Sequence, residues 1–501
     1  MNYDIALADL IKGLNKSEKR YFKIDAGRHT IGEENNYVKL FNLFERHEDY
    51  SKVFAKTPAK NLSATKRHLY QTVLKSMRGY AEKFSGFQLI NGILSDVSYL
   101  YSKGLYGQCK LLLNKAKKIA YDYERFEQLI TIIYWEKIFS GADPSDKGYR
   151  SLQKLHLEEQ KILRILQDIN ELEAIEHDIL SFGRRKGFAR TKEEIKRMHQ
   201  FMTRPILKSS PKNRPLRVNI PYYVAYSLYF ADTYQMVKSY NYRKKAVELY
   251  ESKPLLVNEY FRGYMGLVHN LMVSQRKLKK FTGLLESIER LRNTPTDSIH
   301  KASAIFSTSY IAELNLYLNR GQFEKGINLV PEIERGIHKF KNQLSNEHIL
   351  IFQCNVAYMY FGNEEFKTAL KWLNYILQNE DKYLREDVQV FVRILSLIIH
   401  YELDNPDVVT YYERAITRLL TKKSHRLKTE KAVLNFVKRN IQKNNTKGEL
   451  IAAFIKLKNE LTEYFKDPIE NRIREDFDVL SWINSKIEDR SFAEMIRNKS
   501  K

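Results

Sequence analysis

Length, composition and charge restrict the classes of protein to which this chain can belong. Its 501 residues exceed one ordinary hydrophobic core, so we expect several domains or a repetitive architecture. Hydrophobic residues make up 43% of the chain and charged residues 29%, which excludes wholesale disorder. Only 20 Gly and 11 Pro are present, few for the many tight turns of an all-β chain. A long, helix-dominated protein fits this composition best.

The formal net charge is +24, and most of that charge lies in two segments. Residues 184–217 contain twelve Lys and Arg against two Glu, and residues 418–447 contain ten against one. Concentrated positive charge attracts nucleic acid, anionic lipid or an acidic protein, although both segments could instead be solvated surfaces. The candidate anion- or partner-binding residues are Arg184, Arg185, Lys186, Arg190, Arg197, Lys422, Lys423, Arg426, Lys428, Lys438 and Arg439.

Residues 1–86 predict a small N-terminal helical domain, or a cap, of three or four helices. Asn15 and Glu18 have the spacing of a capping box, and Ser63 could cap a helix predicted over residues 65–84. The helix predicted between them carries an apolar face made of Tyr37, Leu40, Phe41 and Phe44.

Residues 87–202 are predicted to form a first helical-repeat segment, followed by a basic loop or hinge over residues 203–221. That short span holds four of the 11 prolines, namely Pro205, Pro211, Pro215 and Pro221. Proline clusters interrupt helices, so we expect a domain boundary near this span. Residues 222–501 are then predicted to form the main repeat region with its C-terminal helices.

The most regular pattern in that region surrounds Phe366. Small or apolar residues lie at −9, −6, +3, +7 and +10 from it, namely Ala357, Tyr360, Ala369, Leu373 and Ile376. Ala357 and Tyr360 share one face of a first helix, and Ala369, Leu373 and Ile376 share one face of a second helix. The intervening GNEE, residues 362–365, predicts that Gly362 ends the first helix and that a second one follows.

The same template recurs around Tyr106, Phe323 and Leu278, with weaker copies around Tyr242 and Asn405. The positions after the first three markers are Cys109, Leu113 and Ala116; Gly326, Val330 and Ile333; and Phe281, Leu285 and Ile288. From Leu278 onward the markers are 45, 43 and 39 residues apart, a spacing typical of helix-pair repeats. Cys109 is therefore interpreted as a small packing residue and not as a nucleophile.

The patterns LNRGQF…G…V…I, YFGNEEF…A…L…I and SKGLY…C…L…A resemble the tetratricopeptide repeat (TPR) superfamily. The resemblance implies an all-α fold, a right-handed superhelix of antiparallel helix pairs with a concave side. It also implies a protein or peptide as the binding partner.

No catalytic constellation is apparent in the sequence. GxxxxGK[ST], HExxH, CxxC and GxSxG motifs are all missing, and Glu173 and His177 form only an isolated pair one helical turn apart. Cys109 and Cys354 have no metal-ligand spacing and are too few for a disulfide framework. We therefore expect no catalytic residue, no metal and no cofactor.

The 33 Tyr and 26 Phe could provide platforms on which nucleic-acid bases stack. Many of them occupy packing positions of the repeat, however, so core packing is the preferred interpretation. It also covers the dense stretch at residues 222–234, where some rings could reach solvent.

The leading functional hypothesis is a non-catalytic interaction or scaffold protein that binds a protein or peptide. The alternative is a nucleic-acid-binding or regulatory protein that uses the two basic segments. The N-terminal stretch MNYDIALADLIKGL lacks the pattern of a secretory signal, and no run approaches about 18 apolar residues. We expect a cytoplasmic protein that makes no membrane contact, and the oligomeric state stays open.

Overall fold

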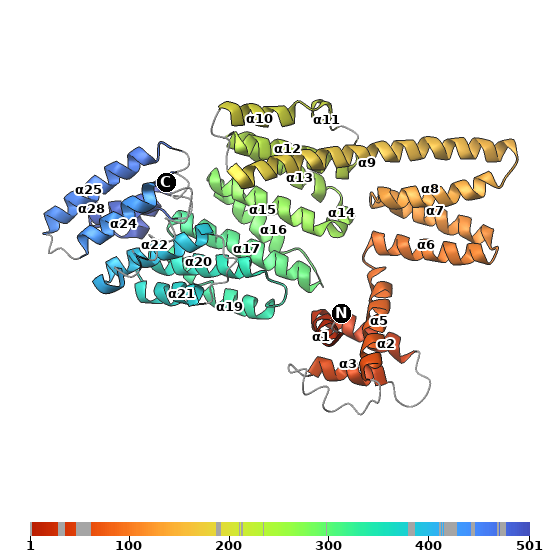
Figure 1. Ribbon diagram of the computed structural model, residues 1–501, viewed down its shortest axis with the longest axis horizontal. Coiled ribbons are helices and arrows are strands. Elements are labelled where there is room, and N and C mark those ends of the chain that lie inside the picture. The colour runs from red at the N-terminus through yellow and green to blue at the C-terminus, as the bar shows by residue number, and fades with distance from the viewer. Residues whose placement is uncertain are drawn as a thin grey trace. The chain divides into compact units, whose positions relative to one another are not determined.

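The computed structural model describes residues 3–28, 36–46, 62–186, 192–209, 211, 214–233, 235–296, 298–378, 386–409, 412, 414, 428–441, 446–467, 470 and 477–500. Over these residues the chain forms 25 helices and no strand (Figure 1). It divides into two compact units, Met1–Ser274 and Gln275–Lys501, which are described separately below. None of the described helices is both long and apolar enough to cross a lipid bilayer.

The first four helices form a small bundle with its own apolar core. They are α1 (Tyr3–Gly13), α2 (Lys16–Gly27), α3 (Asn36–Arg46) and α5 (Leu62–Ala81). The capping box predicted at the start of α2 is confirmed, because Asn15 accepts from the Glu18 amide and Glu18 accepts from the Asn15 amide. The Ser63 cap is wrong, since α5 begins at Leu62 and therefore contains Ser63. The predicted apolar face of α3 is confirmed at Leu40, Phe41 and Phe44, which are buried.

The remaining helices of the first unit pack mainly against their sequence neighbours. They are α6 (Gly86–Ser102), α7 (Tyr106–Asp122), α8 (Phe126–Gly141), α9 (Asp146–Lys186), α10 (Lys192–Met202), α11 (Pro205–Lys208), α12 (Leu216–Asp232), α13 (Met236–Glu251), α14 (Pro254–Glu259) and α15 (Phe261–Lys277). The 41-residue α9 lies along α8 and then along α12, while α12 pairs closely with α13 (Figure 1). Sequential pairing of this kind is what a helical repeat requires.

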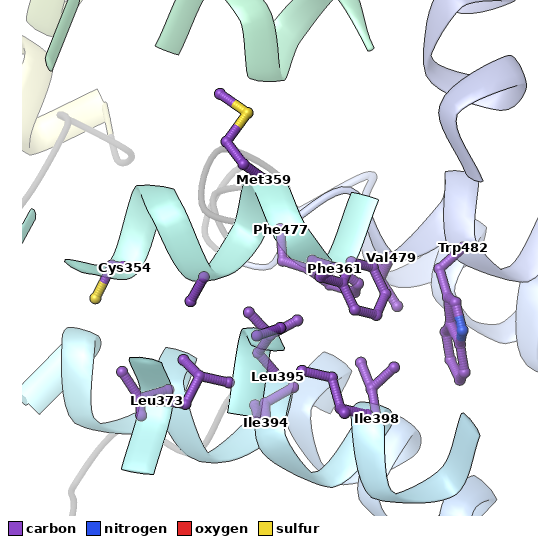
Figure 2. Close-up of a cluster of buried hydrophobic side chains, with 14 of the residues drawn as sticks. Cys354, Met359, Phe361, Leu373, Ile394, Leu395, Ile398, Phe477, Val479 and Trp482 are labelled. Atoms are coloured by element: carbon purple, nitrogen blue, oxygen red, sulfur yellow. The ribbon is translucent and has the colours of Figure 1, made fainter. Parts of the chain in front are cut away.

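The second unit has one continuous apolar core. Its helices are α16 (Phe281–Arg292), α17 (Ile299–Arg320), α18 (Phe323–Ile327), α19 (Val330–Lys339), α20 (Asn346–Gly362), α21 (Phe366–Gln378), α22 (Glu386–Glu402), α24 (Lys428–Asn440), α25 (Lys447–Tyr464), α28 (Val479–Glu488) and α29 (Phe492–Ser500). Figure 2 shows how Phe361 of α20, Ile398 of α22 and Trp482 of α28 converge with Phe477 in this core. The C-terminal helices thus complete the core that the preceding helices begin.

One turn geometry connects most of the helix pairs. A residue with left-handed backbone follows the helix, and the amide of the next residue donates to the carbonyl five positions earlier. This combination recurs at Leu105, Arg125, Lys280, Gln322, Glu365, Asn405 and Arg490, with donor–acceptor distances of 2.7–3.0 Å. Such a Schellman turn satisfies the last carbonyls of one helix and starts the next helix at once. Its recurrence is independent support for a structural repeat.

Only two of the left-handed residues in the described chain are glycines, Gly104 and Gly321. In the Phe366 copy the left-handed residue is Glu364, at φ 62°, and not Gly362. The predicted end of the helix at Gly362 is confirmed, but the reason for that glycine is packing. A Cβ atom on Gly362 would lie 2.4 Å from the Phe323 ring, so the glycine admits a ring from the neighbouring helix pair.

The Cys109 thiol donates to the Val97 carbonyl at 3.6 Å, which confirms the −9 and +3 positions around Tyr106. The Ser239 hydroxyl makes the equivalent contact with the Ser227 carbonyl at 2.8 Å, so this copy is centred on Met236, the first residue of α13, and the predicted marker Tyr242 is wrong by six residues. Both contacts join residues 12 positions apart. Cys109 and Ser239 have no exposed surface, which confirms that Cys109 is a packing residue.

The register predicted for the Leu278 copy is wrong by three residues. Its left-handed residue is Lys279, so α16 begins at Phe281, and Phe281 takes the place that Phe366 has in its own copy. Consequently Leu284 is buried, whereas Leu285, predicted to face the core, is 37% exposed. The apolar character of both leucines made the two registers indistinguishable in the sequence.

The proline-rich span is more helical than predicted. Within residues 203–221, α11 occupies Pro205–Lys208, and α12 begins at Leu216 with the buried Pro221 inside it. A hinge role for this span stays a prediction, as do the four predicted segment boundaries. The division between the two compact units falls inside α15, after Ser274.

Candidate interaction surfaces

The first group of predicted basic residues lies on α9 and α10. Arg184, Arg185 and Lys186 belong to the last turn of α9, but their side chains lie outside the described part of the chain, as does Arg190 altogether. Arg197 is exposed on α10. Of the five candidates in this group, Arg197 alone therefore has a described and exposed side chain, and it belongs to the first unit.

The second group lies in the other unit, and part of it shares one helix. Lys422, Lys423 and Arg426 lie outside the described residues, whereas Lys428, Lys438 and Arg439 are exposed on α24. Because the two groups belong to different units, their convergence stays untested. Within α24, however, the structure brings three of the predicted residues onto a single helix.

Lys431 joins these residues, although it was not among the candidates. It is exposed on α24 and lies one turn after Lys428, on the same side of the helix. The spacing Lys428, Lys431 and Lys438 follows the helical period, and the sequence therefore contained a signal for this face. The buried side of α24 consists of Thr429, Glu430, Ala432, Val433, Leu434, Phe436 and Val437.

A second surface is aromatic and lies where α6, α7 and α8 meet. Its centre, here called the aromatic surface, consists of Tyr101, Tyr106, Trp135 and Phe139. Ring centroids in this group are 5.3–5.9 Å apart for four pairs. Tyr101 is 38% exposed and Tyr106 is 51% exposed, so the cluster is a surface and not part of the core. Three further large side chains are exposed beside it in the sequence: Tyr99, Leu105 and Tyr134.

Tyr106 is exposed although it occupies a position that is buried in another copy of the repeat. It is the first residue of α7 and lies three positions before the buried Cys109, on the same side of the helix. In the equivalent position of another copy, Phe323 is only 2% exposed because further helices of its unit cover it. Tyr106 keeps the aromatic character of that position but has no such cover. A contiguous group of exposed apolar side chains marks an interaction site more often than chance.

Two lysines border the aromatic surface. The Lys103 amine lies 5.6 Å from the centroid of the Tyr99 ring, and the Lys110 amine lies 5.8 Å from that of Phe139. Among the described residues, neither amine forms an ion pair. Asp143 is close enough to Lys110 for the two charges to interact, but hydrogen bonds from Ser145 are the main reason that the pKa of Asp143 is lowered. The aromatic surface thus combines apolar rings with available positive charge.

Tyrosines of the dense stretch at residues 222–234 behave differently. Tyr222 and Tyr229 are buried, and the Tyr226 ring stacks on the Tyr242 ring at a centroid distance of 4.9 Å. Burial raises the pKa of Tyr242, and neighbouring tyrosines add to the effect. For these rings the core-packing interpretation is confirmed, although Tyr234 lies outside the described residues.

Two buried glutamates join distant parts of the first unit. Glu259, whose side chain is 2% exposed, accepts hydrogen bonds from the amides of Gly86 and Phe87 and pairs with Arg125. Its carboxylate therefore caps α6 together with the Ser85 side chain, which accepts from the Gln88 amide, although Glu259 lies at the end of α14. This residue was not singled out in the sequence, since a contact over 173 positions leaves no local pattern.

Glu124 acts in the same way on α12. Its carboxylate accepts from the amides of Leu216 and Arg217 at 2.9 and 2.8 Å and pairs with Lys253 at 2.8 Å. The Arg217 guanidinium in turn binds both oxygens of Glu127 at 2.8 Å. Burial alone would raise the pKa of Glu127, but its hydrogen bonds to Arg217 and the charge of that group lower it overall. These contacts hold α8, α12 and the α13–α14 turn together, and their evident role is structural.

Within the part of the chain that the structure describes, no group of three or more His, Cys, Asp or Glu side chains is arranged to hold a metal ion. The Glu173–His177 pair belongs to no such group among the described residues. Both cysteines are buried. No protein-family model matches the chain, and no curated protein matches its sequence.

Proposed function

We propose that the chain is a non-catalytic interaction protein, built as a TPR-like right-handed superhelix of helix pairs, that binds a peptide segment of a partner protein in the cytoplasm. The aromatic surface on α6–α8 carries this proposal. Tyrosine and tryptophan are the residues that most often dominate binding at protein interfaces, because they bury a large area at low entropic cost. Here two tyrosines and a tryptophan form such a group, and Tyr101 and Tyr106 are exposed.

The chemistry of the surface describes the peptide that it would bind. Apolar or proline side chains would cover the rings of Tyr101, Tyr106 and Trp135, and a carboxylate would pair with Lys103 or Lys110. Within the described chain neither Tyr101 nor Tyr106 has a hydrogen-bond partner for its hydroxyl group, and a backbone carbonyl of the peptide would accept from these hydroxyls. An extended peptide with acidic and apolar side chains would bind the rings, the lysines and the tyrosine hydroxyls at the same time.

The repeat supports the proposal at the level of the fold. The recurring Schellman turns and the close pairs at the −9 and +3 positions resemble those expected of stacked helix pairs. Such arrays present continuous surfaces made of successive helices, and extended peptides bind well to them.

A peptide selection tests the proposal. The full chain would be used to select from a displayed library of random peptides, in parallel with a variant that carries Tyr106→Ser and Tyr134→Ser. Both positions are more than half exposed, so the variant should keep its thermal stability. Tyr375→Ser, at a position 55% exposed on α21, is the matched control.

The proposal predicts that wild type and control enrich the same apolar, acidic peptides. Binding of those peptides to the double variant should be weaker by about tenfold or more, as for the loss of interface aromatics. Failure to enrich any sequence, or equal binding to the double variant, would overturn it.

A further inference from the structure

Helix α24 has two chemically distinct faces. Its exposed side chains are Lys428, Lys431, Asn435, Lys438 and Arg439. They recur at intervals of three or four residues and so lie along one side of the helix. We call this side the basic face of α24.

Among its own exposed residues, the basic face of α24 carries no carboxylate. The sequence of α24 contains a single carboxylate, Glu430, and it is only 8% exposed on the opposite side. Lys428 and Lys438 are ten residues apart, which is about 15 Å along the helix axis. Four cations therefore line a short, straight stretch of surface.

The rest of the second unit holds this face in place. The Glu470 carboxylate accepts from the amides of Lys428 and Thr429 at 2.7 and 3.0 Å and from the Thr429 hydroxyl at 2.8 Å. Phe436, on the buried side of α24, packs 4.6 Å from Phe454 of α25 between ring centroids. Because the backbone is capped and packed, little ordering of the helix would oppose binding.

We propose that the basic face of α24 binds the phosphate backbone of a double-stranded nucleic acid. A duplex carries one charge per about 1.7 Å of its axis, so the length of this face spans about nine phosphates. Lysines and arginines without interspersed acids are the side chains that make such contacts. This binding is separate from the peptide binding proposed above and uses another surface.

Composition favours a duplex over the other polyanions. Interfaces between proteins are depleted in lysine and centred on aromatic or apolar anchors, and the exposed side of α24 has none. Single strands bind to rings on which their bases stack. The exposed side of α24 carries no aromatic residue, although the Tyr464 ring of α25 lies 5.8 Å from the Lys428 amine. Only regularly spaced phosphates match a row that consists of cations and one asparagine.

A salt titration of duplex binding tests the proposal. Binding of the full chain to a fluorescent duplex would be measured between about 50 and 200 mM salt. Four contacts predict a slope of about −3.6 in log affinity against log salt concentration, since each neutralised phosphate contributes about −0.9. The variant Lys431→Gln with Arg439→Gln should bind less tightly and with a slope of about −1.8.

The control variant is Lys115→Gln with Lys118→Gln, which removes the same net charge from exposed positions of α7. Its slope should equal that of wild type, and so should that of the Tyr106→Ser, Tyr134→Ser variant, which separates this test from peptide binding. The proposal would be overturned by the absence of duplex binding at about 50 mM salt, or by equal slopes for the α24 and α7 variants. Tighter binding of a single strand or of poly-glutamate than of the duplex would also refute it.

Discussion

Glu259 caps a helix that begins 173 residues earlier, with its carboxylate 3.0 Å from the amide of Gly86. The same carboxylate pairs with Arg125, whose guanidinium also lies 4.7 Å from the centroid of the Tyr260 ring. Three parts of the first unit, at α6, at the α7–α8 turn and at the end of α14, thus depend on a single buried side chain. An array in which each helix pair touches only its neighbours would contain no such contact.

Glu259→Ala should therefore lower the free energy of unfolding by about 3 kcal/mol, because Arg125 and two amides lose their partner in a buried setting. Glu259→Gln keeps one acceptor oxygen and should lower it by less. Urea denaturation followed by circular dichroism measures both. Glu248→Ala, at an exposed residue of the surface pair with Lys244, should change it by less than about 0.5 kcal/mol, and an equal loss there would contradict the assignment.

The helix pairs were predictable from the sequence because their signals are local. Ala369, Leu373 and Ile376 follow Phe366 at the helical period, and all three are buried. The capping box at Asn15 was equally readable. The register of the Leu278 copy was not predictable, because both possible registers place a leucine in the core. Only the left-handed turn residue Lys279 distinguishes them.

Contacts between distant segments left no such signal. The Phe323 ring stacks on the Phe492 ring at a centroid distance of 5.7 Å and so joins α18 to α29 in the second unit. Glu259 joins distant segments of the first unit in the same way. For the candidate surfaces, counting charges identified Lys428 and Arg439, but only burial showed that both lie on the exposed side of α24. The aromatic surface assembles Tyr101, Tyr106 and Trp135 from three helices, and the dense run of tyrosines at residues 222–234 proved to be mostly core.

Gly362→Ala should destabilise the second unit. A Cβ atom there would lie 2.4 Å from the Phe323 ring, which is itself confined by Phe492. Overpacking of this kind costs about 1–3 kcal/mol. Gly448→Ala provides the comparison, since a Cβ atom at that helical position meets nothing within 4 Å. The comparison variant should be at least as stable as wild type in urea, and a similar loss in both variants would exclude the steric explanation.

Glu364→Gly should have the opposite effect. Glu364 holds a φ of 62° in the turn before α21, a conformation that L-residues other than glycine adopt only with strain. Relief of that strain should raise the free energy of unfolding by up to about 1 kcal/mol, less the entropy that glycine adds to the unfolded chain. Lys371→Gly, at an exposed position inside α21, should instead lower it by about 1 kcal/mol. Destabilisation by both substitutions would show that the turn is not strained at Glu364.

Asp232 should make stability depend on pH. Burial at the end of α12 raises the pKa of its carboxyl to about 6, and the charge of Arg243 opposes the shift only in part. The folded chain therefore binds more protons than the unfolded chain between about pH 4 and pH 6, so this group's contribution to stability falls as pH rises through that window and is constant above it. The loss should reach about 2 kcal/mol, given the partial exposure of the carboxyl. Asp232→Asn removes the titration, so the variant should gain stability relative to wild type between pH 4 and pH 7 in urea denaturation. A difference between the two proteins that stays constant over this range would refute the prediction.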